Sequence, residues 1–277
     1  MLQQEAMIER THRVCREDER LAAAMMYGSF AQGEGDGLSD IEFILFFRDE
    51  DLESVDQEEW VSRISPVGLY FVNEYGNGTA IFDNLVRGEF HFDGASDIER
   101  VVGESMRDAD WLPSLEGTLI LDRTGELTPR LKRIVGPPPA RDTPEDVLYL
   151  CNCFVNWFVF GANLFARGEL ARSLDLLGIL RDRLLQMVRI LEGSTLHWFN
   201  SSKFLEREIS GSSYARYAAC TARLGREDLR QAYISAWKWG RELMSSLADT
   251  YAVALPSALL VRLDGRFDDT FRGVEAQ

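Results

Sequence analysis

The stretch from Met26 to Phe47, MYGSFAQGEGDGLSDIEFILFF, constrains the fold more than any other part of the sequence. The apolar run Leu21–Tyr27 stops at Gly28, and a glycine-containing loop separates it from a second apolar run, Ile41–Phe47. Short apolar runs bounded by glycine are typical of buried strands. The pattern therefore predicts two strands joined by a glycine-rich turn.

Two acidic residues, Asp40 and Glu42, stand at the start of the second predicted strand. Side chains alternate along a strand, so both carboxylates are expected on one face, with Ile41 and Phe43 on the other. Neighbouring carboxylates can bind a hard cation such as Mg²⁺ through their oxygens. The alternative is a pair that only caps and solvates an edge strand, but the buried strand expected here disfavours an unpaired carboxylate.

The turn before the acids suits a phosphate group. Gly28 can adopt a positive φ and has no side chain, so backbone N–H groups and the Ser29 hydroxyl can approach a phosphate closely. A phosphate-binding turn beside an acid pair for metal predicts a site for nucleotide chemistry.

A third carboxylate, Glu89, lies on the predicted strand Val86–Phe92, VRGEFHF. Alternation places Arg87, Glu89 and His91 on one face of this strand. Glu89 is therefore a candidate third metal ligand, or a general base for an attacking hydroxyl group. The alternative is a surface glutamate paired with Arg87 or His91.

The character of the sequence changes at Gly136-Pro137-Pro138-Pro139, because successive prolines cannot continue a helix or a central strand. Strands and helices are expected before this point, and helices alone from Thr143 onward. We expect the fold class α+β: a catalytic domain over 1–136 with a mixed twisted sheet and flanking helices, a linker over 137–141, and an all-α bundle over 142–277. From Pro256 onward the sequence predicts only a tail.

Lys203 is a candidate phosphate ligand in the helical half. The chain has only three lysines among its 30 basic residues, and Lys203 follows two serines at the predicted start of a short helix. The N-terminus of a helix favours anions. The alternative is a solvated surface lysine.

The net charge of −15 belongs to the first half: residues 1–140 carry 28 acidic and 13 basic residues, whereas residues 141–277 carry 17 of each. Such a chain repels nucleic acid and attracts a small cationic substrate. We find no uninterrupted apolar run of about 18 residues and no signal-peptide pattern. A cytoplasmic protein that binds neither nucleic acid nor membrane is therefore expected.

The spacing of Gly28-Ser29, ten intervening residues, and Asp40-Ile41-Glu42 resembles nucleotidyltransferases of the polymerase-β type. That family usually has Asp at the second acid, so Glu42 departs from its pattern. Over its full length the chain is similar to lincosamide nucleotidyltransferases, which adenylylate lincomycin and clindamycin. The stretches that carry this similarity are MYGSFAQGEGDGLSDIEF, IFDNLVRGEFHFDGASDIE, LILDRTGEL, ARGELARSLDLL and HWFNSSKFLERE.

The resemblance implies an antibiotic-inactivating enzyme that transfers AMP from an NTP, with ATP expected, to a hydroxyl group of a lincosamide. It further implies two Mg²⁺ ions, release of pyrophosphate and a homodimer. The residues with implied roles are Ser29 for phosphate, Asp40 and Glu42 for metal, and Glu89 for metal or base. Gly28 and Lys203 are phosphate-binding candidates from the sequence pattern itself. Two alternatives stay open: an aminoglycoside nucleotidyltransferase, and a non-catalytic binding module of the antitoxin type.

Overall fold

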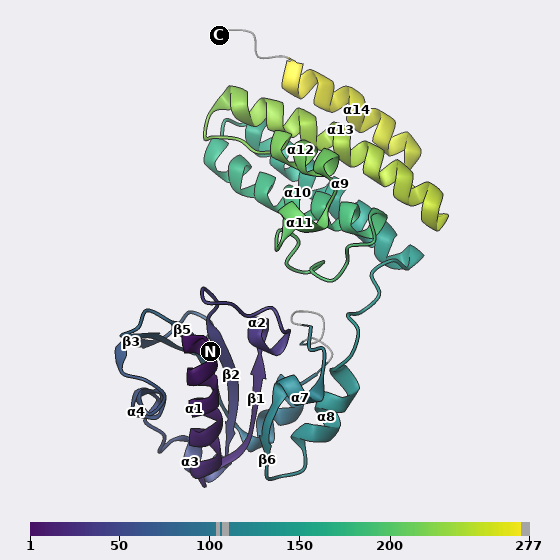
Figure 1. Cartoon of the computed structure of the whole chain (residues 1–277). Helices are drawn as coiled ribbons and strands as arrows, with labels where there is room; N and C mark the ends of the chain where they lie inside the picture. Colours follow the sequence, from purple (N-terminus) through teal and green to yellow (C-terminus); the bar gives the residue numbers. More distant parts are fainter. Residues whose placement is uncertain (104–105, 107–110, 273–277) are drawn as a thin grey trace. The chain divides into compact units, whose positions relative to one another are not determined.

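The structure is a computed structural model that describes residues 1–103, 106 and 111–272. The chain divides into two compact units, Met1–Pro139 and Ala140–Gln277. Each unit is described by itself (Figure 1). The domain bounds expected from the sequence, 1–136 and 142–277 with a linker between them, stay a proposal.

The first unit is built on a six-stranded sheet in the order β3-β4-β5-β2-β1-β6. Its strands are β1 (Leu21–Tyr27), β2 (Ile41–Phe47), β3 (Val67–Val72), β4 (Gly78–Phe82), β5 (Arg87–Gly94) and β6 (Leu119–Asp122). β2 and β5 are parallel, whereas the other neighbouring pairs are antiparallel. The sheet is therefore mixed, and β1 and β2 have the bounds predicted from the sequence.

Helices flank this sheet, and one side of it is filled by aromatic side chains. The helical segments are α1 (Gln3–Glu17), α2 (Gly28–Ala31), α3 (Asp49–Leu52), α4 (Gln57–Ser62), a 3-10 turn (Ala95–Asp97), α5 (Ile98–Val101), α7 (Leu115–Thr118) and α8 (Leu127–Ile134). Phe43 of β2 stacks on Phe90 of β5 with ring centroids 5.7 Å apart, and Trp60 of α4 meets Phe90 edge-on at 6.3 Å. Alternation along β2 and β5 consequently turns Glu42 and Glu89 to the opposite face.

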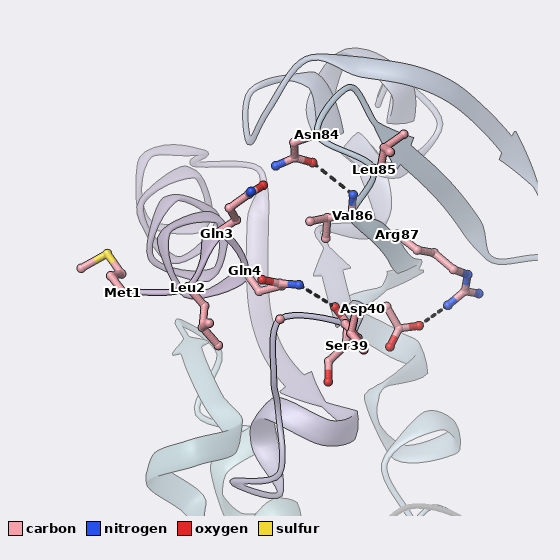
Figure 2. A pocket seen from close by; sticks show the side chains of 12 residues that line it. Met1, Leu2, Gln3, Gln4, Ser39, Asp40, Asn84, Leu85, Val86 and Arg87 are labelled. Atoms are coloured by element: carbon pink, nitrogen blue, oxygen red, sulfur yellow. Dashed lines mark hydrogen bonds and ion pairs between the residues drawn. The ribbon is translucent and has the colours of Figure 1, made fainter.

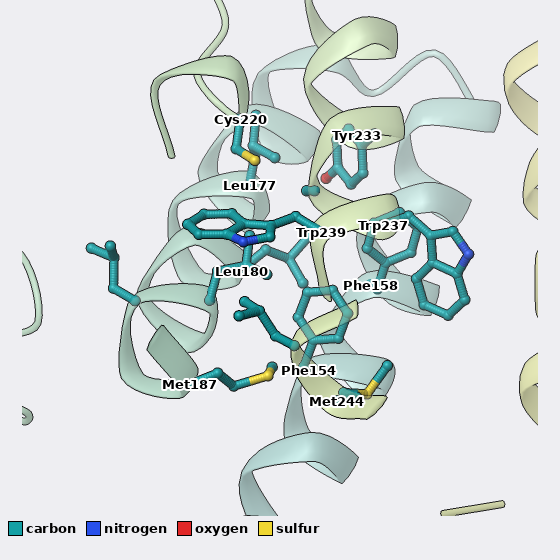
Figure 3. Close-up of a cluster of buried hydrophobic side chains, with 14 of the residues drawn as sticks. Phe154, Phe158, Leu177, Leu180, Met187, Cys220, Tyr233, Trp237, Trp239 and Met244 are labelled. Carbon is teal, nitrogen blue, oxygen red and sulfur yellow. The ribbon is translucent and has the colours of Figure 1, made fainter. Parts of the chain in front are cut away.

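The second unit is all helical: α9 (Pro144–Ala166), α10 (Leu170–Leu191), α11 (Leu205–Glu208), α12 (Gly211–Ala219), α13 (Arg226–Tyr251) and α14 (Ser257–Arg272). Figure 3 shows its core, where Phe154 and Phe158 of α9 pack with Trp237 of α13. The expected fold class, α+β with a mixed sheet followed by a helical bundle, is confirmed.

The expectation of a tail after Pro256 is wrong, because residues 257–272 form α14. This helix buries Leu260, Leu263, Phe267 and Phe271. Its apolar stripe is interrupted by charged residues, so the helix is stabilised only when that stripe packs against the bundle.

Within the described residues one helix, α9, is long and apolar enough to span a membrane by length and composition alone. Phe154, Phe158 and Phe165 of this helix are fully buried inside the second unit. α9 therefore serves as a core helix of the bundle in this structure.

Candidate functional site

The register of the central strands brings the predicted acids together. β2 and β5 pair Glu42 with Glu89, and β1 and β2 pair Tyr27 with Glu42. Directly paired residues on adjacent strands point to the same face of a sheet. Tyr27, Glu42 and Glu89 therefore form a row across three strands, while Asp40 lies one residue before β2 and Arg87 begins β5.

Gly28 and Glu42 fit one another in a way that only glycine allows. Gly28 has a φ of +72°, and a Cβ built on it would lie 1.5 Å from Oε2 of Glu42. The Glu42 carboxylate thus occupies the space that any side chain at position 28 would need. The predicted turn is also tighter than an open loop, because α2 begins at Gly28.

Ser29 follows Gly28 and has an Oγ atom that is buried without a hydrogen-bond partner among the described residues. A buried hydroxyl without a partner costs about 1–3 kcal/mol. A ligand oxygen would remove this cost, and a phosphate oxygen is the acceptor that the predicted role requires. The geometry at Ser29 is therefore consistent with a ligand-binding turn.

Arg87 joins two of the three acids. One of its terminal nitrogens donates to Asp40, as Figure 2 shows, and the other donates to Oε2 of Glu89 at 2.5 Å. Oε1 of Glu89 accepts from the Tyr27 hydroxyl at 3.1 Å and from Nδ2 of Asn77 at 3.2 Å. Glu89 is thus paired with Arg87, as one interpretation of the sequence anticipated, and lies in a cluster of donors.

The same contacts govern ionisation at the site. Burial by itself would raise the pKa of Glu89, but the hydrogen bond and charge of Arg87 outweigh it and hold the pKa below its usual value of 4.5. Burial lowers the pKa of His91 below 6.5 despite the nearby Glu89. At neutral pH Glu89 is therefore a carboxylate and His91 a neutral ring, with its Nε2 lying 2.9 Å from the Tyr27 hydroxyl.

The donor set has the chemistry of a hard-cation site, because Asp40, Glu42 and Glu89 all offer carboxylate oxygens. Within residues 1–103, 106 and 111–272, however, no group of three or more His, Cys, Asp or Glu side chains is arranged to hold a metal ion. Asp40 and Glu89 are instead both bonded to Arg87. The residues fit a divalent cation by type, and in this structure two of them, Asp40 and Glu89, are paired with Arg87.

A pocket of about 710 Å³ opens beside Asp40 and Arg87. It is lined by residues 1–4, 37–40 and 84–87, which come from the start of α1, the loop before β2 and the β4–β5 hairpin (Figure 2). Leu38 and Leu85 expose most of their surface at this place. Sequence reasoning missed the pocket because its three segments are far apart in the chain and local patterns do not show that they come together.

Lys203 belongs to the second unit and lies in the turn before α11. That helix spans only four residues, so the predicted helix start is short. The fully buried Arg189 donates to the carbonyl oxygens of Lys203 at 2.6 Å and Ser201 at 2.9 Å, and thereby fixes this turn. The Lys203 ammonium lies 5.3 Å from the centroid of the Phe204 ring. Its role as a phosphate ligand stays a prediction.

Comparison with known proteins addresses the second unit most directly. Residues 143–265 match the family model described as lincosamide nucleotidyltransferase-like, C-terminal domain. The helical unit belongs to this domain family. The resemblance predicted from the sequence is thereby confirmed for the second half of the chain.

Solved structures give more distant similarities. An aminoglycoside 6-adenyltransferase from Bacillus subtilis is 14% identical with a TM-score of 0.46, and 97% of each chain is covered. A nucleotidyltransferase-like protein from Exiguobacterium sibiricum is 14% identical with a TM-score of 0.38, and the match covers 90% of this chain and 78% of that one. No curated protein sequence matches this chain.

Proposed function

We propose that the protein is a Mg²⁺-dependent nucleotidyltransferase that transfers AMP from an NTP, with ATP expected, to a hydroxyl group of a lincosamide. The family of residues 143–265 supports the class of enzyme. The register of β2 and β5 is the observation that carries the site, because it sets Glu42 beside Glu89 on one face, next to the Gly28-Ser29 turn.

Each site residue has a role that its chemistry supports. Asp40, Glu42 and Glu89 would hold Mg²⁺, which supplies charge stabilisation for the transferred phosphoryl group, as two such ions do in related chemistry. The turn at Gly28-Ser29 would bind the nucleotide phosphates through backbone N–H groups and the hydroxyl, and Lys203 is proposed as a further phosphate ligand.

Glu89 would accept the proton of the attacking hydroxyl group while the oxygen of that hydroxyl group bonds to the α-phosphorus and pyrophosphate leaves. A general base of this kind contributes about 10²–10⁴-fold in rate. Because Glu89 is ionised at neutral pH, it can accept a proton there.

The pocket beside Asp40 supports a singly charged, partly apolar acceptor. Asp40, which is paired with Arg87, is the one carboxylate among the described lining residues, and Leu2, Leu38 and Leu85 are exposed at the edge of the pocket. A lincosamide carries one amine, whereas an aminoglycoside carries several and would require more convergent carboxylates. We further propose a cytoplasmic homodimer that binds neither nucleic acid nor membrane.

The test is a panel of lincosamides and aminoglycosides incubated with ATP and Mg²⁺ and analysed by mass spectrometry. We expect lincomycin and clindamycin to gain the mass of one AMP group. Modification of aminoglycosides alone would replace the proposed substrate. The absence of pyrophosphate release with every acceptor would favour the non-catalytic module.

The site itself is tested by Asp40→Asn, with Asp83→Asn as the control because Asp83 is an exposed acid of the same unit. We expect Asp40→Asn to abolish transfer with an unchanged circular dichroism spectrum, and Asp83→Asn to retain activity. Full activity of Asp40→Asn would refute the assignment of the acids.

A further inference from the structure

The proposed function gives no role to Arg87, although this residue contacts two of the site's acids. Its two terminal nitrogens reach two carboxylates from different segments: Asp40, just before β2, and Glu89, within β5. The fork of the guanidinium group suits two carboxylate partners at once. The positively charged Arg87 therefore lies between two acids that the proposed function assigns to metal binding.

We propose that Arg87 is a built-in counter-ion of the acid site, which holds Asp40 and Glu89 together until a divalent cation replaces it and thereby sets the cation affinity. Arg87 is in this sense a positioning residue. The inference rests on the proposed function, because it assumes that these acids bind the metal.

The surroundings of the three side chains support this exchange. The side chains of Asp40 and Glu89 are 31% and 19% exposed, so water screens their mutual repulsion only in part. Two carboxylates in such a place need a nearby positive charge. Glu42, paired with Glu89 in the register, adds a third negative charge to the same face.

Arg87 also has room to leave. Its side chain is 40% exposed and, with Asp40, lines the 710 Å³ pocket. Figure 2 shows the guanidinium group at the side of this pocket, bonded to Asp40. A rotation of the Arg87 side chain toward solvent would free Oδ2 of Asp40 and Oε2 of Glu89 without moving the backbone of β2 or β5.

A merely structural bridge makes a different prediction. In that case, removal of Arg87 would change the stability of the first unit and leave its affinity for cations as it was. If Arg87 competes with the cation, its removal must tighten cation binding, because a positive charge next to the binding position is lost.

The experiment titrates the full-length chain with Mn²⁺ alone, without nucleotide, and follows free Mn²⁺ by electron paramagnetic resonance. The variants are Arg87→Gln, Arg87→Lys and Asp40→Asn. Arg100→Gln is the matched control, because Arg100, whose side chain is 67% exposed, also joins two acids of this unit, Asp93 and Asp97. Circular dichroism reports whether each variant is folded.

We expect Arg87→Gln to lower the Kd for Mn²⁺ by about tenfold or more, since like charges a few ångströms apart repel strongly in a partly buried site. Arg87→Lys should bind with wild-type or intermediate affinity, because lysine retains the charge without the fork. Arg100→Gln should leave the Kd within about twofold of wild type, since solvent and salt screen the charge of a side chain that is 67% exposed.

An unchanged or raised Kd in Arg87→Gln would overturn the inference, as would an equal decrease in Arg100→Gln. If Asp40→Asn still abolishes Mn²⁺ binding in that case, the proposed metal site stands and only the role of Arg87 fails. If neither the wild type nor Arg87→Gln binds Mn²⁺, the metal site of the proposed function fails with it.

Discussion

Position 28 has two structural requirements that only glycine meets, and alanine substitutions at Gly28 and at a control glycine can separate them. The backbone needs a positive φ, and the carboxylate of Glu42 needs the space where a Cβ would stand. Gly33 provides a matched control in the turn after α2: its φ is +75°, and a Cβ there would meet nothing within 4 Å. Gly33→Ala therefore carries the backbone strain alone.

The expected magnitudes follow from these two terms. A left-handed conformation costs a residue with a Cβ about 1–2 kcal/mol relative to glycine. In Gly28→Ala the Glu42 side chain must also turn away, which adds about 0.5–1.5 kcal/mol if it leaves a favoured rotamer. We expect the free energy of unfolding to fall by about 1–2 kcal/mol in Gly33→Ala and by about 1.5–3.5 kcal/mol in Gly28→Ala.

Activity should separate the two variants more sharply than stability. A reacting or metal-binding group that is displaced by about 1 Å can cost about 10²-fold in rate. We expect Gly28→Ala to lose at least that factor in pyrophosphate release with ATP, Mg²⁺ and acceptor, and Gly33→Ala to stay within a few-fold of wild type. Urea unfolding of both variants gives the stability difference.

Two results would refute this reasoning. Equal losses of activity in Gly28→Ala and Gly33→Ala would show that backbone strain in the loop explains both. Wild-type turnover in Gly28→Ala would show that the position of Glu42 is not needed for the reaction.

Two further predictions concern the second unit. A Cβ on Gly240 would lie 2.2 Å from Phe154, so Gly240→Ala should lower the free energy of unfolding by about 1–3 kcal/mol, measured by thermal unfolding. A Cβ on Gly178 would meet nothing within 4 Å, so Gly178→Ala should raise it by about 0.5–1 kcal/mol. Equal shifts in the two variants would contradict the packing argument. Burial would raise the pKa of Glu208, but the hydrogen bond from Arg189 helps to hold it below 4.5. Its contribution to stability is therefore present above the unfolded-state pKa and lost as pH falls through the folded-state pKa. We expect the free energy of urea unfolding to fall less steeply from about pH 7 to about pH 3 in Glu208→Gln than in the wild type. Parallel pH curves of the two proteins would contradict this prediction.

Much of the site could be predicted because the signals are local. Alternation has a period of two residues, so the sequence places Asp40 and Glu42 on one side of a strand and Glu89 on one side of another without any knowledge of their neighbours. The bounds of β1 and β2 followed from apolar runs with glycine at one end. The helix start at Thr143 followed from capping chemistry, and its side chain accepts a hydrogen bond from the Asp146 amide.

The contacts between those elements could not be predicted in the same way. The carboxylate of Glu42 lies against Gly28, Arg87 bonds to both Asp40 and Glu89, and a pocket forms from three segments separated by tens of residues. Pairings of this kind depend on strand order and register, which many local patterns leave undetermined.

The sequence by itself determined which residue types carry the chemistry and on which face of each strand they stand, because these follow from the backbone repeat. The tertiary structure decided which of them meet. It set Arg87 between Asp40 and Glu89, where the sequence left a metal site and an ion pair open for Glu89. It also turned the segment after Pro256 into α14, because the packed core buries that helix's apolar stripe.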